Sequence, residues 1–349
     1  MNLQARSTLR RPLGVMHVTD TLETGGAERV AVNLVNLLPR SEYSTHLCTT
    51  RRDGPLLSLV AEDVGRLRLG RRRTTDVGAL WRMTRYIQTN EIDILHAHGT
   101  SVFIAVMASL FPPYPRVVWH DHYGRYRFDD RPVMVYRAAA RRISGVIAVN
   151  QPLADWSHEQ LHVPADRVWF VPNFVCDTRV QTTVDIPGTP GSRIVCVANF
   201  RPEKDHMTLL GAMGIVVRRF PQAHLNLIGA EIDPQYAGAI RSAIQERGLA
   251  AHVSMLGQRS DVPDILRLCD IGVLSSASEG FPLALLEYGM AGLASVATSV
   301  GQCREVLDSG RAGVVVPAAN PAILGRALLD LLESAELRAQ FGKRSADER

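Results

Sequence analysis

The chain has 349 residues, which is about the length of two domains. Hydrophobic residues make up 46% and charged residues 21%, which excludes collagen-like and disordered proteins. No run of about 18 apolar residues occurs, so no membrane-spanning helix is expected. The five cysteines are scattered and no signal-peptide pattern is evident, which predicts a cytoplasmic protein without a disulfide framework. The net charge of +4 is mild and no nucleic-acid-binding module is recognisable, so nucleic acid is not an expected partner.

Short apolar runs alternate with helical patterns in the first half of the chain. A helix is expected over residues 27–38, after the first strand, and another over 102–110. The predicted strands are 14–18, 92–97, 116–119, 143–149 and 168–171. Strands that alternate with helices favour a parallel, doubly wound sheet.

Residues 177–192 are rich in Thr, Pro and Gly and lack apolar periodicity, which predicts a linker between a domain of residues 1–176 and one of residues 193–349. The alternation then restarts. Its strands are 194–198, 225–228, 253–256, 271–274, 295–298 and 313–316, and its helices are 208–220, 235–247, 262–268, 283–291 and 321–341. We therefore expect two Rossmann-like domains that face each other across a ligand-binding cleft.

The strongest chemical signal is the segment EGFPLALLE, which runs from Glu279 to Glu287. Pro282 suits the first position of the helix that follows, because its missing N–H has no partner to lose. The backbone amides from Gly280 onward would then surround a helix N-terminus, which is a site for phosphate. Glu287, about one and a half turns inside the helix, could accept from both hydroxyls of a ribose. Either glutamate alone would be read as an ordinary surface carboxylate.

Two cations, Arg201 and Lys204, follow the first strand of the second domain. Only Lys204 and Lys343 are lysines among the 39 basic residues, which makes Lys204 conspicuous. Cations at the carboxyl end of a strand could neutralise the charge that grows on a diphosphate leaving group. Ordinary solvated basic residues in a turn would give the same pattern.

These segments together resemble the family 4 (group 1) retaining glycosyltransferases of GT-B fold. The family's hallmark is two glutamates separated by seven residues, and Glu279 and Glu287 match it. The sequences GGAER at 25–29, DILHAHG at 93–99 and SMLG at 254–257 also match family motifs in the same order. The resemblance covers about residues 14–341.

The resemblance implies transfer of a hexosyl group, with retention, from a UDP- or GDP-sugar to a glycan or lipid-linked acceptor, without a metal or other cofactor. The setting it implies is bacterial surface polysaccharide or glycolipid biosynthesis. His120 would hydrogen-bond and orient the donor sugar, and Gly26 would let the backbone approach the diphosphate. The catalytic set is then His120, Arg201, Lys204 and Glu279, and the donor-binding set is Gly25, Gly26, Gly280, Phe281, Pro282, Leu283 and Glu287.

Two features depart from the family pattern. Ala198 and Asn199 stand where the family often has Gly-Arg, so its arginine is displaced to Arg201. Family members also commonly continue with a helix that crosses back to the first domain, whereas the sequence ends at Arg349. The resemblance therefore implies either a short crossover or a truncated chain.

Several alternatives remain open at this point. His96, His98, His120 and His122 on adjacent strands could bind zinc, although a sugar site explains one such histidine per strand and we assign no metal. The basic stretch 66–73, with Arg82 and Arg85, would be a solvated surface or a peripheral contact with anionic lipid. A nucleotide-sugar epimerase or a non-catalytic sugar-nucleotide-binding subunit would share the architecture.

Overall fold

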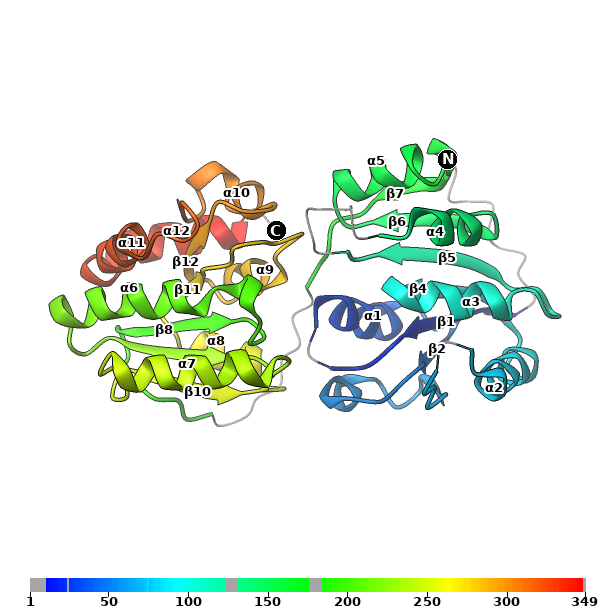
Figure 1. Cartoon of the computed structure of the whole chain (residues 1–349), viewed down its shortest axis with the longest axis horizontal. Helices are drawn as coiled ribbons and strands as arrows, with labels where there is room; N and C mark the ends of the chain where they lie inside the picture. The colour runs from blue at the N-terminus through cyan, green and yellow to red at the C-terminus, as the bar shows by residue number, and fades with distance from the viewer. Residues whose placement is uncertain (1–10, 24, 74, 124–130, 176–183, 348–349) are drawn as a thin grey trace. The chain divides into compact units, whose positions relative to one another are not determined.

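The computed structural model describes residues 11–347 except 24, 74, 124–130 and 176–183. The described residues form two compact units, one that ends at Asn173 and one that begins at Phe174. Each unit is a parallel sheet covered by helices (Figure 1). Doubly wound α/β architecture is therefore confirmed for both halves. Among the described residues, no helix is long and apolar enough to cross a bilayer.

The first unit has a seven-stranded sheet in the order β3-β2-β1-β4-β5-β6-β7. Its strands are β1 Leu13–Thr19, β2 Tyr43–Thr49, β3 Gly65–Arg68, β4 Ile92–His98, β5 Arg116–Asp121, β6 Ile143–Ala148 and β7 Val168–Phe170. Its α-helices are α1 Gly26–Leu37, α2 Val77–Thr89, α3 Val102–Ala108, α4 Val133–Ala140 and α5 Gln151–Glu159, and the turn η3 Gly99–Ser101 joins β4 to α3.

Alternation along the central strands gives this sheet two different faces. Met16, Leu95 and Trp119 are fully buried with the inner residues of α2 and α3 in an apolar core. The opposite face carries the intervening residues of the same strands, which include His17, His96 and His120. An apolar core on one face and a row of imidazoles on the other is unusual for buried parallel strands.

The second unit has a six-stranded parallel sheet in the order β10-β9-β8-β11-β12-β13. Its strands are β8 Arg193–Val197, β9 His224–Ile228, β10 Val253–Gly257, β11 Ile271–Leu274, β12 Ala294–Thr298 and β13 Val314–Val316. Its helices are η5 Pro202–Lys204, α6 His206–Arg219, α7 Pro234–Glu246, α8 Val262–Arg267, α9 Leu283–Met290, α10 Cys303–Val306, α11 Pro321–Glu333 and α12 Ala335–Asp347. One face packs against α6, α7 and α11, and the other against α8 and α9.

The expected linker is only partly described. Its later part packs on the second unit, because Ile186 is buried and the Arg193 guanidinium donates to the carbonyl oxygens of Gly188 and Ile186 at 2.8 and 3.3 Å. Residues 176–183 lie outside the described part of the chain. The helical region expected over 321–341 consists of two helices, since Ser334 adopts an extended conformation between α11 and α12.

Candidate functional site

The loops that follow β8 and β11 in the second unit are neighbours. The two strands are paired, with Ile194 opposite Ile271. Along the chain, β9 and β10 extend the sheet from one edge of β8, whereas β11 adds to the other edge of β8. This is the point where the strand order reverses, the usual place for a ligand in a doubly wound sheet. The two loops carry Arg201, Lys204 and Glu279.

Backbone and side-chain hydrogen bonds hold these two loops together. The carbonyl oxygen of Glu203 accepts from the backbone N–H of Ala277 at 2.9 Å, and that of Lys204 accepts from the hydroxyl of Ser275 at 3.1 Å. Asp205 adopts a left-handed conformation, with φ 44°, and its side chain caps α6 by accepting from the N–H of Thr208. The turn that presents Lys204 is therefore fixed on both sides.

Lys204 and Glu279 form the central contact of this region. Lys204 Nζ lies 2.6 Å from Glu279 Oε1, and the same oxygen accepts from the hydroxyl of Ser276 at 2.6 Å. Glu279 is only 7% exposed, whereas a quarter of the Lys204 side chain is accessible. A partly accessible ammonium is thus held on a buried carboxylate, where a ligand's anionic group could reach it.

The structure separates the second predicted cation from this pair. Arg201 is exposed and forms an ion pair with Glu203, in which the nitrogen and oxygen lie 3.8 Å apart. Lys204 and Glu279 come together as catalytic candidates, and Arg201 stands at the rim of the same loop.

The prediction for Pro282 is wrong by one residue. Pro282 precedes the helix as its N-cap, with φ −80° and ψ 94°, and Leu283 is the first helical residue. The first amides of α9 still have no acceptor within the helix, so its N-terminus keeps the donors that the predicted anion site needs. Gly280 and Phe281 lie in the loop before it, and Glu287 is half-buried within α9.

Gly301 allows the next loop to pack against the segment 279–280. Its φ is 56°, and a Cβ there would lie 2.4 Å from the carbonyl oxygen of Glu279. The N–H of Gln302 donates to the carbonyl oxygen of Gly280 at 3.1 Å. Only glycine suits this position, which therefore supports the geometry of Glu279.

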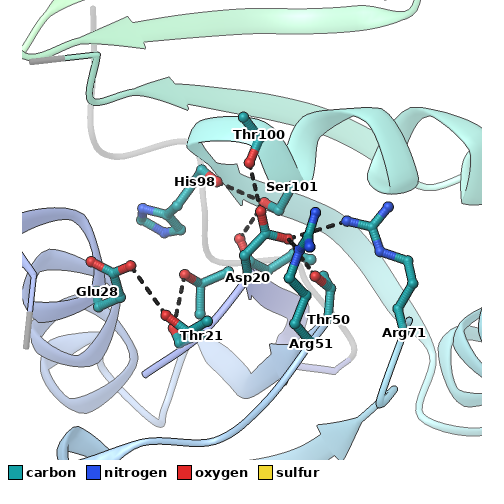
Figure 2. A network of polar contacts seen from close by, with 11 residues as sticks. Asp20, Thr21, Glu28, Thr50, Arg51, Arg71, His98, Thr100 and Ser101 are labelled. Atoms are coloured by element: carbon teal, nitrogen blue, oxygen red, sulfur yellow. Dashed lines mark hydrogen bonds and ion pairs between the residues drawn. The ribbon is translucent and has the colours of Figure 1, made fainter. Parts of the chain in front are cut away.

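In the first unit, Asp20 organises the carboxyl ends of β1 and β2 and the start of η3 (Figure 2). Its carboxylate accepts from the hydroxyls of Thr50 and Thr100, the latter at 2.5 Å, and from the Arg71 guanidinium at 3.3 Å. These groups lie at the β1–β4 boundary, where the strand order of this sheet reverses. Asp20 thereby fixes the start of the loop that leads to Gly25.

Gly25 and Gly26 lie at the N-terminus of α1. Gly25 is the N-cap, and a Cβ on it would meet the Glu28 carboxylate at 2.2 Å. Gly26 is the first helical residue. The glycine loop is therefore placed at a helix N-terminus, as its predicted role in diphosphate binding requires.

His120 lies one residue before the end of β5, among four other histidines. It is 4% exposed, and its Nε2 has no hydrogen-bond partner among the described residues. Burial, followed by the neighbouring His122, holds the pKa of His120 well below its usual value. The side chain is thus a neutral imidazole, suited to hydrogen bonding rather than to charge stabilisation.

Arg71 does not belong to the surface predicted for the stretch 66–73. It is 9% exposed and pairs with Asp20, whereas Arg72 and Arg73 are exposed. Sequence reasoning also missed Asp20, Ser276 and His17, whose importance depends on contacts with residues far away in the chain. For His17, the signal was available as a histidine on a buried strand.

Comparison with known proteins agrees with this geometry. The family model described as glycosyl transferases group 1 matches residues 188–348, and the model described as glycosyltransferase family 4 matches residues 24–179. The phosphatidyl-myo-inositol mannosyltransferase of Mycobacterium tuberculosis is 28% identical over 272 residues, which cover 74% of this chain and 70% of that protein. The Escherichia coli UDP-Gal:alpha-D-GlcNAc-diphosphoundecaprenol alpha-1,3-galactosyltransferase is 22% identical over 310 residues, 82% of this chain and 79% of that protein.

Solved structures show the same fold at lower identity. Anabaena HepE in complex with UDP-glucose superposes with a TM-score of 0.79 at 18% identity, and the match covers 96% of this chain and 94% of that one. WaaG, a glycosyltransferase involved in lipopolysaccharide biosynthesis, gives a TM-score of 0.72 at 13% identity over 96% and 95% of the two chains. The chain therefore belongs to the group 1, family 4 glycosyltransferases of GT-B fold.

Proposed function

We propose that this chain transfers a hexosyl group from a nucleotide diphosphate sugar to a hydroxyl acceptor, with retention of configuration. The observation that carries the proposal is the Lys204–Glu279 pair beside the N-terminus of α9, at the reversal point of the second sheet. An ammonium and a set of helix-start amides in one place suit a diphosphate. Glu287, inside the same helix, would accept hydrogen bonds from the ribose hydroxyls.

In the proposed reaction the bond between the anomeric carbon and the diphosphate oxygen breaks. The acceptor hydroxyl attacks from the same face, and its proton passes to the departing phosphate oxygen. Negative charge grows on the diphosphate, so Lys204 stabilises the transition state more than the bound donor. Arg201 adds a second cation at the rim, and this scheme assigns no metal to the leaving group.

The remaining residues of the predicted site bind and orient the donor. Glu279 would contact the donor sugar, with the backbone from Gly280 to Leu283 on the phosphates. In the first unit, the N-terminus of α1 at Gly25 and Gly26 would approach the diphosphate. His120, a neutral imidazole whose Nε2 has no partner in the described part of the chain, would hydrogen-bond the donor sugar.

The names of the relatives support a glycolipid or polysaccharide acceptor and a UDP-linked donor, because two act on lipid or lipid-linked substrates and HepE binds UDP-glucose. A GDP-linked donor is the alternative that the assay below tests. A peripheral membrane contact fits the first unit. Val77 and Trp81 are 78% and 61% exposed on α2, and Arg85 lies over the Trp81 ring at 5.5 Å. Exposed aromatic and basic side chains together favour the surface of an anionic bilayer.

The experiment is a release assay for nucleoside diphosphate with a panel of UDP- and GDP-sugars, with and without a bacterial lipid extract as acceptor. We expect release to depend on both a matching donor and the extract. Interconversion of donor sugars without an acceptor would instead indicate an epimerase. Tight donor binding by the purified chain, with no turnover for any donor and acceptor, would indicate a binding subunit.

Membrane contact has a separate test. Replacing Trp81 with Ser should reduce sedimentation with vesicles that contain anionic lipid, and replacing Arg72 and Arg73 with Ser should do the same. Exposed Met290 on the second unit gives a matched control, Met290→Ser, which should sediment like the wild type. Equal sedimentation of all variants would rule out docking through α2.

A further inference from the structure

Five histidines form one cluster at the carboxyl ends of the three central strands of the first sheet. His17 lies on β1, His96 and His98 on β4, and His120 on β5, with His122 just after it. His17 pairs in register with His96, and His98 with His120. Because residues two apart on a strand share a face, all five rings lie on one side of the sheet. The proposed donor site uses only His120.

The ring nitrogens of the cluster face one another at short range. His17 Nδ1 lies 3.1 Å from His98 Nε2, and His98 Nδ1 lies 3.0 Å from His122 Nε2. His96 Nε2 lies 3.2 Å from His120 Nδ1. A neutral imidazole has one donor and one acceptor, so a closed set of such contacts should leave no nitrogen unpartnered.

Three buried nitrogens of the cluster nevertheless have no hydrogen-bond partner among the described residues. They are Nε2 of His17, Nε2 of His120 and Nδ1 of His122. His17 and His98 are 1% and 3% exposed. Contacts among the rings therefore satisfy only part of the cluster, and packing alone does not explain five imidazoles in one place. None of these three nitrogens is a ligand in the arrangement proposed below.

We propose that His17, His96 and His98 bind a zinc-type divalent transition metal ion. Imidazole nitrogen suits such ions, and ligand atoms of these three side chains lie within 4.8 Å of one another. The 3.1 Å between His17 Nδ1 and His98 Nε2 is close to the edge of about 3.3 Å expected for a tetrahedron with Zn–N bonds of about 2.0 Å. These two nitrogens are spaced for a hydrogen bond between them and also for two ligands of one ion.

The other possible triad, His98, His120 and His122, fits less well. Two imidazoles on one tetrahedral ion place their ring centroids about 5 Å apart, since each ring radiates from the metal. Centroid distances within His17, His96 and His98 are 4.5, 4.8 and 5.4 Å. His120 and His122 lie only 4.0 Å apart, which is too close for two ligands of one ion. Rings also stack within the favoured triad, with an angle of 7° between the planes of His96 and His98, so these side chains would rotate about their χ angles to share an ion.

The remaining two histidines then act as outer partners of the ligands. With His98 Nε2 on the metal, its Nδ1–H can donate to His122 Nε2; with His96 Nδ1 on the metal, its Nε2–H can donate to His120 Nδ1. Metal-bound imidazoles commonly donate their second N–H in this way. This arrangement would leave the proton of His120 on Nε2, where it could be donated to the sugar. That use of the proton rests on the proposed function, whereas the metal site does not.

The test is zinc binding by the full chain, purified without a polyhistidine tag and stripped with chelator. Equilibrium dialysis against Zn²⁺ and elemental analysis should give one ion per chain. His17→Phe and His98→Phe should each weaken binding by at least about a hundredfold. His122→Phe removes only an outer partner and should weaken it by about 10- to 100-fold. Exposed His162 gives the control, and His162→Asn should bind like the wild type.

Cobalt substitution of the wild type keeps the proposal testable if a variant fails to fold. Co²⁺ should show the visible absorption of a tetrahedral nitrogen site, and Zn²⁺ should displace it. A chain that retains no zinc and gives no such spectrum would overturn the proposal. Binding that survives His17→Phe but not His120→Phe would place the ion in the other triad and overturn this assignment. Neither result depends on glycosyl transfer.

Discussion

A double-mutant cycle on Lys204 and Glu279 separates the structural role of this pair from its role in transfer. Glu279 is 7% exposed, and Lys204 Nζ lies 2.6 Å from its Oε1. At that distance the Coulomb attraction is about 1.6 kcal/mol in bulk water and about 6 kcal/mol at an effective dielectric constant near 20. Desolvation offsets much of the larger figure, since the carboxylate is withdrawn from water.

Lys204→Met removes the ammonium from the buried Glu279 carboxylate, which keeps its hydrogen bond from Ser276. An uncompensated buried polar group costs about 1–3 kcal/mol, and the remaining exposure of the site keeps the loss within that range. For a unit of this size the loss corresponds to about 2–4 °C in melting temperature per kcal/mol. The double variant Lys204→Met/Glu279→Gln should recover most of it, because neither charge remains.

Turnover should respond differently from stability. Loss of one preorganised cation at the leaving group should lower kcat by about a hundredfold to a thousandfold, with a smaller change in KM. Lys204→Arg should recover only part of kcat, because a planar guanidinium cannot occupy the same point. The double variant should stay slow although it is stable. Scanning calorimetry and initial rates on the four proteins measure both effects, and a double variant with near-normal kcat would refute the catalytic role of Lys204.

Two further outcomes follow from contacts in the second unit. Gly301→Ala should destabilise the folded protein more than Gly248→Ala. Both positions have a positive φ, but of the two only Gly301 would bring a Cβ against backbone, 2.4 Å from the Glu279 carbonyl oxygen. Equal unfolding free energies of the two variants would show that the loop relaxes at no cost. Burial lowers the pKa of His206 to about 4, below about 6.5 in the unfolded chain, so its contribution to stability is complete above about pH 6.5 and is lost as pH falls towards 4. Denaturant unfolding of His206→Phe across this window should show a weaker pH dependence than the wild type, and an unchanged dependence would assign the acid sensitivity to other groups.

Sequence periodicity was sufficient for the second sheet because its strands are short apolar runs between helices. The strands of the first sheet are harder to predict from sequence. β2 places Thr45 and His46 in buried positions, and His46 is tolerated there because its Nδ1 lies 2.9 Å from the hydroxyl of Tyr86, a partner 40 residues away. β3 has four residues, two of them arginines, and resembles a basic surface stretch.

The candidate site was predictable to the extent that it is local. Glu279, Glu287 and the start of α9 belong to one segment, so their spacing identified them. The contact between Lys204 and Glu279 joins residues 75 positions apart, and that between Arg71 and Asp20 joins residues 51 apart. No local pattern encodes such pairs, so the sequence alone predicts a surface position for Arg71 and no role for His17.

Calorimetric titration of the wild type and Glu287→Ala with UDP and GDP tests the donor site most directly. Glu287 is proposed to accept from both ribose hydroxyls, so its loss should weaken binding of the preferred nucleotide by at least about tenfold. Glu246→Ala, an exposed glutamate at the end of α7, is the matched control and should leave the affinity unchanged. One nucleotide that binds the wild type and the control but binds Glu287→Ala weakly is the expected result. Equal affinity in all three proteins would show that the nucleotide is not held at α9.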